Sequence, residues 1–477
     1  MRICLIAEGC YPYVAGGVSS WIQMLIKGMP EHTFVIYTIA ASKEQEGQFK
    51  YELPSNVEQV QENFLDQFMD AKIRKRADYR LKPEEFQALL DLITKDRTDW
   101  DLLFELFGAD GPCRANEFLA SDAFLDVVME ACRDTYRLTP FNRVFWTIRS
   151  MLLPVLNILR CPVPEVDVFH AVSTGYAGLL GAMFKKKTGK PFLITEHGIY
   201  SREREEEILK AKWVDVYFKQ TWIDFFIGMS LAAYGKADRI ISLFYHARDL
   251  QIGYGADPDR CFVIPNGIQM SRFESIPPIQ EEPHSLVLGA VIRVVPIKDL
   301  KTMIYSFALV RNALPDACLY LIGPTDEDPE YYRECLDLIG SLQVEGIHFV
   351  GRVDVAQWYG KVDLVLLSSI SEGQPFVVLE AMASRRPVVA TDVGSCRELI
   401  EGNGDGLGPA GEVVPVMSPN LMAKSILRLG RDPELMRRMA ENGHERVKRY
   451  YLEEDFLAAY RKLYGEVKEQ WQESGLS

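Results

Sequence analysis

The fold of this chain is decided by the stretch LVLLSSISEGQPFVVLE, residues 364–380. Its first four residues are apolar and predict a buried strand, and Pro375 stands where a helix can begin, because the first helical turn tolerates proline. Glu372 then falls in the loop and Glu380 on the helix. An ionised carboxylate only accepts hydrogen bonds, so this pair suits the vicinal hydroxyls of a ribose or a hexose, and the helix N-terminus between them suits phosphate. The alternative is a pair of helix-capping acids.

Strand-like runs alternate with helix-like runs on both sides of this stretch, which is typical of parallel sheets with crossover helices. The pattern predicts an α/β chain with two doubly wound domains. In the first half we expect strands at residues 3–7, 33–37, 166–170, 192–196, 239–243 and 261–264. In the second half we expect them at residues 286–292, 317–322, 347–350, 364–367 and 388–390, with a helix at 300–313.

The domain boundary is expected in the proline-rich and charged stretch IPPIQEEP, residues 276–283. An N-terminal domain then covers residues 1–276 and a C-terminal domain covers residues 277–450. Residues 41–160 interrupt the alternation with helical spacing, for example at 83–93 and 117–136, and indicate a helical insertion. Residues 451–477 contain an apolar helical stripe, so we expect this last helix to pack back on the N-terminal domain.

Composition and charge exclude several classes of protein. The 477 residues are 48% hydrophobic and 25% charged, which is typical of globular domains and not of disordered or collagen-like chains. The net charge of −14 disfavours a nucleic-acid-binding protein. The nine scattered cysteines show no metal or redox spacing and fit a reducing cytoplasm. No apolar run approaches the length of a membrane-spanning helix.

Two cations follow the first predicted strand of the second domain. Arg293 and Lys298 lie in RVVPIKD, residues 293–299, before a helix, so one sheet edge would carry both. A fork-shaped and a point-like cation together can neutralise a pyrophosphate. Solvated surface charge is the alternative. The acidic run Asp326-Glu327-Asp328 follows Gly323-Pro324 and fits a solvated loop better than a metal motif, so we expect no metal ion.

The first domain offers two further candidates. Gly16 and Gly17 precede a helical stretch and can let a phosphate approach backbone N–H groups, although a simple turn explains them equally well. His197 follows the strand at 192–196, at the edge where open α/β sheets hold ligands. A histidine packed in a loop is its alternative. The dinucleotide fingerprint Gly-x-Gly-x-x-Gly is missing after the first strand, which disfavours an oxidoreductase.

These motifs, taken in order along nearly the whole chain, resemble the retaining glycosyltransferases of family 4. The likeness rests on Gly16-Gly17-Val18, Asn266-Gly267-Ile268, the two cations and the Glu-x7-Glu pair. Three features resemble the PelF-type branch of this family, which consists of enzymes of exopolysaccharide synthesis. They are the sequence EGCYPY at residues 8–13, the sequence TEHGIY at residues 195–200 and the long insertion. The resemblance implies the GT-B fold, in which two Rossmann-like domains face a cleft.

The resemblance also implies roles for single residues. The donor would bind the C-terminal domain, with its diphosphate at Arg293 and Lys298, its ribose at Glu380 and its sugar at Glu372, and His197 would lie near that sugar as an active-site residue. The remaining implied contacts with the donor are Gly16, Gly17, Asn266, Gly373, Phe376, Arg352 and Val353, and backbone in the loop at 351–353 would read the base. Many relatives have glycine where this chain has Asp299, so the shape of the donor loop is an open point.

The expected activity is hexosyl transfer from a UDP-sugar, most simply UDP-glucose, to a growing Pel-type exopolysaccharide of a biofilm. No cofactor and no metal are expected, and the partners would be the donor, a polysaccharide acceptor and membrane-bound synthase subunits, without nucleic acid. The expected location is the cytoplasm, with peripheral attachment to the inner membrane through partners. Two alternatives remain, a non-catalytic or weakly catalytic cytosolic synthase subunit and a GT-B UDP-sugar epimerase.

Overall fold

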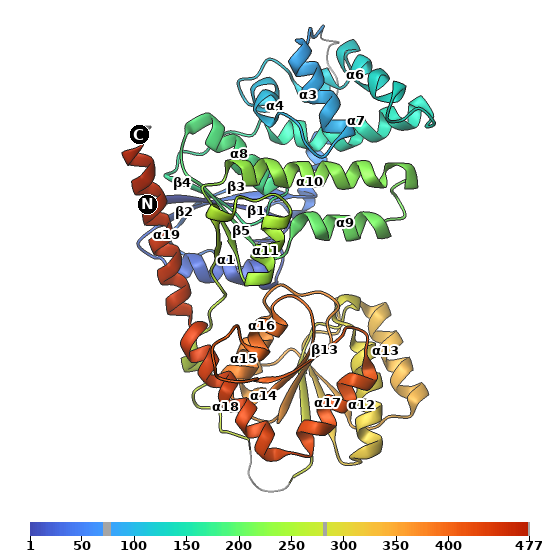
Figure 1. Ribbon diagram of the computed structural model, residues 1–477, viewed down its shortest axis with the longest axis vertical. Helices are drawn as coiled ribbons and strands as arrows, with labels where there is room; N and C mark the ends of the chain where they lie inside the picture. Colours follow the sequence, from blue (N-terminus) through green and yellow to red (C-terminus); the bar gives the residue numbers. More distant parts are fainter. Residues whose placement is uncertain (70–77, 280–283, 476–477) are drawn as a thin grey trace. The chain divides into compact units, whose positions relative to one another are not determined.

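The computed structural model describes residues 1–69, 78–279 and 284–475. Its contacts divide the chain into two compact units, one made of Met1–Val263 with Tyr460–Ser477 and the other of Ile264–Ala459. We name them the N-terminal unit and the C-terminal unit, and each is described by itself. Each holds a parallel sheet flanked by helices (Figure 1).

The sheet of the N-terminal unit has the strand order β3-β2-β1-β4-β5-β6-β7, and its pairs are parallel. Its central strands are continuous apolar runs because helices cover both faces. The strands are β1 Arg2–Glu8, β2 Thr33–Ala40, β3 Val57–Phe64, β4 Val168–Ala171, β5 Phe192–Glu196, β6 Arg239–Ser242 and β7 Cys261–Val263. The helices beside them are α1 Gly17–Lys27, α8 Tyr176–Thr188, α9 Tyr200–Lys210, α10 Lys219–Lys236 and α11 Tyr245–Gly253.

A helical insertion lies above α8 and α10 in the view of Figure 1, on the sheet face opposite α1. Its helices are α2 Asp66–Met69, α3 Pro83–Thr94, α4 Trp100–Phe107, α5 Ala115–Phe118, α6 Asp122–Arg133 and α7 Phe141–Ile158. The insertion shares one apolar core with the sheet, since Leu92, Phe107 and Leu152 belong to the same buried cluster as Ile6 and Phe169. It is therefore part of the N-terminal unit and has no separate core.

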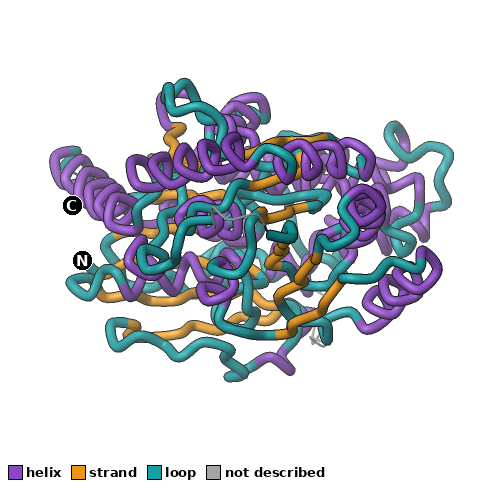
Figure 2. Tube along the Cα trace, turned by 90° about the horizontal axis from the view of Figure 1, so that it is seen from below, coloured by secondary structure: helices purple, strands orange, loops and turns teal. Residues whose placement is uncertain are grey.

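The last helix, α19 (Glu453–Glu473), packs on the N-terminal unit from Tyr460 onward, as expected from its apolar stripe. Tyr464 OH lies 2.7 Å from His170 Nδ1, and Tyr460 OH lies 2.9 Å from Thr195 Oγ1. Lys468 pairs with Asp167 at 3.2 Å. Both chain ends lie on the same side of this unit in the two views (Figures 1 and 2).

The sheet of the C-terminal unit has the order β10-β9-β8-β11-β12-β13, again parallel. Leu364 and Leu366 face one apolar cluster with α12, α13 and α17, whereas Val365 and Leu367 face another with α15 and α16. The strands are β8 Val287–Val291, β9 Cys318–Ile322, β10 Ile347–Gly351, β11 Leu364–Leu367, β12 Val388–Thr391 and β13 Gly411–Val414. The helices are α12 Leu300–Ala313, α13 Pro329–Leu342, α14 Val355–Tyr359, α15 Phe376–Ala383, α16 Cys396–Glu401, α17 Pro419–Gly430 and α18 Pro433–Tyr450.

The structure corrects the expected domain limits. The first division falls between Val263 and Ile264, which is before the expected boundary at residue 276. The second falls between Ala459 and Tyr460, so the C-terminal unit continues past residue 451 and includes the first residues of α19. The reason is packing: Ile268, Phe273 and Ile276 belong to a core cluster of the C-terminal unit. The expected hinge is anchored there as well, because Arg386 donates to the Pro277 carbonyl at 2.8 Å. Residues 280–283 of that hinge lie outside the described residues.

The expected helical insertion at 41–160 also needs correction, because it begins with a strand. β3 pairs with β2 as an edge strand, and Val57 to Phe64 carry too many polar residues to read as a buried strand. The expected helix at 117–136 is two helices, since the Ser121 side chain accepts from the Phe124 N–H at 3.3 Å and begins α6 there. Among the described residues, no helix combines the length and apolar character needed to cross a bilayer.

Candidate active site

The Glu-x7-Glu stretch forms the expected strand, loop and helix. β11 ends at Leu367, and α15 begins at Phe376 with Pro375 as its N-cap residue, one position earlier than a first-turn proline. No side chain caps α15, so its first N–H groups keep their capacity to bind an anion. The loop packs tightly, because the Gly373 carbonyl accepts from Ser395 N at 2.9 Å, and Gly394 adopts a φ of +53° beside it.

Glu372 and Lys298 form an ion pair at the carboxyl edge of the sheet. They reach it from neighbouring strands, since Lys298 follows β8 and Glu372 follows β11. Ser369 Oγ donates to the same carboxylate oxygen of Glu372 at 2.5 Å. The two side chains are only 19% and 12% exposed. A cation and a carboxylate predicted to bind adjoining parts of one ligand are therefore in direct contact.

The loop that carries Lys298 keeps its shape without glycine. Asp299 adopts the left-handed conformation, with φ +45°, and its side chain accepts from the Thr302 N–H at 3.2 Å to begin α12. Non-glycine residues in this region carry strain, which a helix-capping hydrogen bond can offset. The replacement of glycine by Asp299 is thus compatible with the turn that presents Lys298.

The two arginines expected at the donor are held by acids of one loop. Arg293 pairs with Glu327 at 2.9 Å, and Arg352 pairs with Asp326 at 3.1 Å. Both acids follow β9, which lies between β8 and β10 in the sheet, so the loops of three adjacent strands meet here. Val353 is 40% exposed beside this loop. The acidic run is exposed to solvent, as expected, and it also pairs with the two arginines at the surface.

Glu380 lies below this edge, on α15. Its carboxylate accepts from Tyr359 OH at 3.0 Å. Burial raises the pKa of Glu380, and the hydrogen bond from Tyr359 and the charge of Arg272 partly offset this rise. A buried carboxylate with one side-chain donor retains capacity for further donors, such as ribose hydroxyls.

We expect Glu380→Ala to weaken UDP binding by about 1–3 kcal/mol, the usual worth of hydrogen bonds to a charged group. The matched control is Tyr359→Phe, which removes the donor to Glu380 and leaves the carboxylate, and should weaken binding less. Isothermal titration with UDP measures both. Unchanged UDP affinity in Glu380→Ala, with lowered thermal stability, would assign the pair to the core alone.

Asn266 is buried against the same loop. Its backbone N–H donates to Gln374 Oε1 at 2.5 Å, and its side-chain amide donates to the Gln374 carbonyl at 3.4 Å. Both residues are nearly inaccessible, at 2% and 6% exposed. Asn266 therefore positions the loop between Glu372 and α15, and it does so as part of the C-terminal unit.

His197 lies at the carboxyl end of β5 in the N-terminal unit. Its ring stands edge-on to Trp21, with centroids 4.8 Å apart, and burial lowers its pKa to about 3. Its Nε2 is buried without a hydrogen-bond partner among the residues that the structure describes. The imidazole is therefore neutral at physiological pH and has an unused polar atom. The preceding Glu196 accepts from Thr174, Tyr234 and Gln251, which fixes the end of the strand.

Gly16 and Gly17 lie at the N-terminus of α1, as expected. Gly16 is the N-cap residue with φ 176°, which is ordinary extended backbone, and a Cβ at either position would meet open space. No side chain caps this helix end. The glycines are thus not required by backbone conformation or packing, and they leave the helix N-terminus accessible.

The candidate residues divide between the two units. Gly16, Gly17 and His197 belong to the N-terminal unit, and the others belong to the C-terminal unit, where Arg293, Lys298, Glu372 and Arg352 gather at one sheet edge. The sequence did not reveal four supporting contacts, made by Trp21, Tyr359, Ser369 and Gln374. Of these four residues, only Ser369 had a signal in the sequence, because it belongs to the pair Ser368-Ser369 directly after the predicted strand at 364–367.

Two known protein families match this chain, one in each half. Residues 1–259 match the family described as Domain of unknown function (DUF3492), and residues 282–432 match the family described as Glycosyl transferases group 1. A curated relative is the MMP alpha-(1→4)-mannosyltransferase of Mycolicibacterium hassiacum, 24% identical over 65% of this chain and 73% of its own length. The chain is thus similar to glycosyltransferases across both units.

Solved structures agree on the fold. HepE from Anabaena, in complex with UDP, is 16% identical and covers 98% of this chain and 100% of its own, with a TM-score of 0.61. The sucrose-phosphate synthase of Thermosynechococcus elongatus is also 16% identical, covers 98% of each chain and has a TM-score of 0.62. Two Rossmann-like parallel-sheet units with these neighbours show the GT-B fold. This chain is therefore a GT-B glycosyltransferase that belongs to the family described as Domain of unknown function (DUF3492).

Proposed function

We propose that this protein transfers a hexosyl unit from a UDP-sugar, most simply UDP-glucose, with retention of anomeric configuration and without a metal ion. The observation that carries the proposal is the contact between Lys298 and Glu372 beside the uncapped N-terminus of α15. Solved HepE chains hold UDP and UDP-glucose, which supports UDP-glucose as the donor.

Departure of UDP leaves negative charge on the β-phosphate. Lys298, Arg293 and the first N–H groups of α15 are fixed donors that would stabilise this charge as it develops. They also supply the electrostatic function that a divalent cation serves in other transferases. Before the donor binds, Glu372 and Glu327 neutralise these two cations, so donor binding exchanges carboxylates for phosphate.

The remaining groups act on the sugar and the ribose. Glu372, released from Lys298, would accept hydroxyls of the donor sugar, and Glu380 would accept those of the ribose. Backbone in the loop at 351–353 would read the base, next to Arg352 and Val353, and Gly373 and Phe376 would line the diphosphate. The neutral His197 would donate or accept a hydrogen bond at the donor sugar, with Gly16 and Gly17 presenting N–H groups to phosphate.

We further propose that the acceptor is a growing exopolysaccharide of the Pel type, assembled in the cytoplasm with membrane-bound synthase subunits. The likeness of residues 8–13 and 195–200 to the PelF-type branch supports this proposal. The net charge of −14 favours attachment through protein partners over direct binding to anionic lipid.

UDP and UDP-glucose should bind more tightly than ADP-, GDP- or CMP-linked sugars, and turnover should survive EDTA. Turnover should survive EDTA because Lys298, Arg293 and helix N–H groups supply the positive field that a metal would provide. The preference for UDP follows from the proposed reading of the base by the loop at 351–353. A thermal-shift screen of nucleotide sugars tests the preference, because a ligand that binds the folded state raises its stability by mass action. A larger shift with another nucleotide, or activity lost in EDTA and restored by Mg²⁺, would contradict the proposal.

A further inference from the structure

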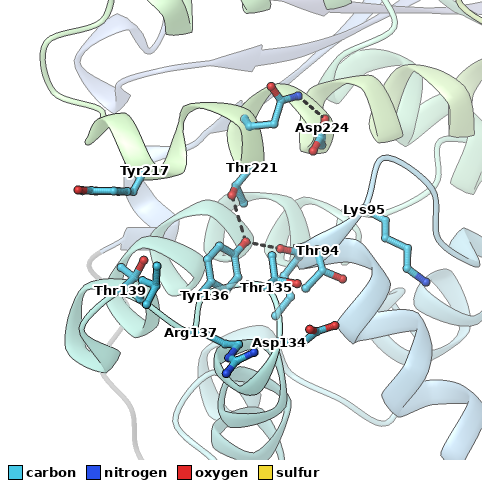
Figure 3. Close-up of a pocket in the computed structure, with 13 residues that line it drawn as sticks. Thr94, Lys95, Asp134, Thr135, Tyr136, Arg137, Thr139, Tyr217, Thr221 and Asp224 are labelled. Atoms are coloured by element: carbon cyan, nitrogen blue, oxygen red, sulfur yellow. Dashed lines mark hydrogen bonds between the residues drawn. The ribbon is translucent and has the colours of Figure 1, made fainter.

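The helical insertion and α10 line an open pocket of about 670 Å³ in the N-terminal unit (Figure 3). Its wall comes from the end of α3, from residues 134–139 between α6 and α7, and from residues 217–224. The volume lies in the range of about 300–1,000 Å³ that is usual for small-molecule sites. Neither the candidate donor residues nor His197 line it, so the pocket is separate from the site described above.

The lining of this pocket combines apolar surface, which includes the 99% exposed Leu138, with polar groups whose charges balance. Its charged lining residues are Lys95, Arg137, Asp134 and Asp224, which makes two cations and two anions. Hydroxyl and amide groups stand between them, for example Gln220, whose side chain donates to Asp224 at 2.8 Å. Such a lining offers donors and acceptors without a net charge, and it suits a neutral ligand rich in hydroxyl groups.

The floor of the pocket is rigid. Tyr136 is buried, its hydroxyl donates to the Ile93 carbonyl at 2.6 Å, and the same hydroxyl lies 3.1 Å from Thr221 Oγ1 (Figure 3). These contacts join α3, the segment before α7 and α10. The pocket therefore has a formed base that joins two elements of the insertion to α10.

One exposed aromatic ring lines this pocket. Tyr217, which lines it, is 73% exposed, whereas Phe218 directly after it is buried and anchors the segment. Exposed rings on an anchored segment offer flat apolar surface at little entropic cost, and the C–H faces of sugar rings stack on such surface.

We propose that this pocket, with Tyr217 in its wall, binds a neutral oligosaccharide, namely the acceptor chain. The proposal rests on the proposed function, because it assigns a carbohydrate acceptor to the insertion. A lipid surface fits less well, since the cations of the pocket are matched by acids and Arg143 nearby is paired with Asp215 at 2.9 Å. The insertion would then hold the growing polymer while its end reacts elsewhere.

Isothermal titration of the full chain, without donor, tests the proposal with neutral hexasaccharides of β-1,4-glucose, α-1,4-glucose and β-1,4-N-acetylglucosamine. At least one should bind, and Tyr217→Ala should weaken that binding about threefold to tenfold, the range for loss of one aromatic stacking partner. Tyr217→Phe keeps the ring and should restore most of the affinity. Trp146→Ala is the matched control, because Trp146 is 62% exposed and does not line the pocket.

Absence of binding to all three hexasaccharides, or equal loss in Tyr217→Ala and Trp146→Ala, would overturn the proposal. Adsorption to vesicles of anionic phospholipid that is lost in Tyr217→Ala would assign the surface to lipid instead. Lys298→Ala separates this proposal from the donor assignment, because it should reduce UDP affinity and leave hexasaccharide binding unchanged. Unchanged UDP affinity in Lys298→Ala would count against the donor site alone.

Discussion

Glu372→Ala should lower kcat and kcat/KM together by about 10²–10³-fold, the usual cost of removing one preorganised electrostatic contact of a transition state. The contact with the donor sugar gains strength as the ring flattens and becomes positively charged. UDP binding should be unchanged or stronger, because the substitution frees Lys298, which Glu372 neutralises in the ligand-free protein. Initial-rate kinetics and titration with UDP measure the two effects separately.

Lys298→Ala is the matched comparison, since it removes the other half of the same ion pair. It should reduce UDP affinity, whereas Glu372→Ala should not, and the double variant should show non-additive effects because the two side chains are in contact. If Glu372→Ala lost UDP affinity in proportion to turnover, Glu372 would be a ground-state binding residue. Unchanged binding and turnover in both variants would make the pair structural.

The pairing of Lys298 with Glu372 is a consequence of topology that the sequence largely contained. Both residues follow predicted strands of one parallel sheet, and parallel strands end at the same edge. What the sequence lacked is the strand order, which makes β8 and β11 neighbours and brings the two side chains into contact. The sequence therefore predicted that both residues lie at this edge, and it did not predict their ion pair.

The contacts of Arg293 and Glu380 could not be predicted in the same way. Glu327 meets Arg293 through the loop after β9, whose residues were expected to be solvated. Tyr359 meets Glu380 only because α14 and α15 pack together beneath the sheet edge. Such partners are set by tertiary packing between segments that have no shared sequence pattern.

The fold was predictable where strands are buried on both faces, as at Phe192–Glu196 and Leu364–Leu367, whose limits agree with the expectation. Two edge strands, β3 and β13, were missed, whereas the edge strands β7 and β10 were expected. β3 is largely polar, and the four residues of β13 follow a glycine-rich loop, so neither shows the continuous apolar run of a central strand. The boundary at 276 was misplaced because prolines indicated a hinge, while the apolar residues Ile268 and Phe273 before them pack in the C-terminal core.

A buried arginine holds that glycine-rich loop. Arg446 on α18 is 1% exposed, and its guanidinium donates to both oxygens of Asp405, at 2.5 and 3.1 Å, and to the Gly408 carbonyl at 2.6 Å. It also donates to carbonyls at the end of α16, at Leu399 and Ile400. The glycines at 402, 404, 406 and 408 have positive φ values, so the loop has high conformational freedom when unfolded. The Arg446 side chain thus donates hydrogen bonds to acceptors of the loop and of the end of α16 at the same time.

Arg446→Met should destabilise the protein by about 3–5 kcal/mol, because it leaves Asp405 and several carbonyls unpaired in a buried site. Thermal unfolding should register this as a fall in Tm of the C-terminal unit of roughly 6–20 °C. The matched control is Arg449→Met on the same helix, whose exposed pair with Glu445 should contribute less than about 1 kcal/mol.

Arg446 holds the pKa of Asp405 below its ordinary value, so the ion pair stabilises the fold at neutral pH and this contribution disappears as the carboxyl becomes protonated in acid. The difference between wild type and Arg446→Met should therefore shrink below about pH 4; equal Tm values for the two arginine variants at neutral pH would show that the buried pair does not hold the loop.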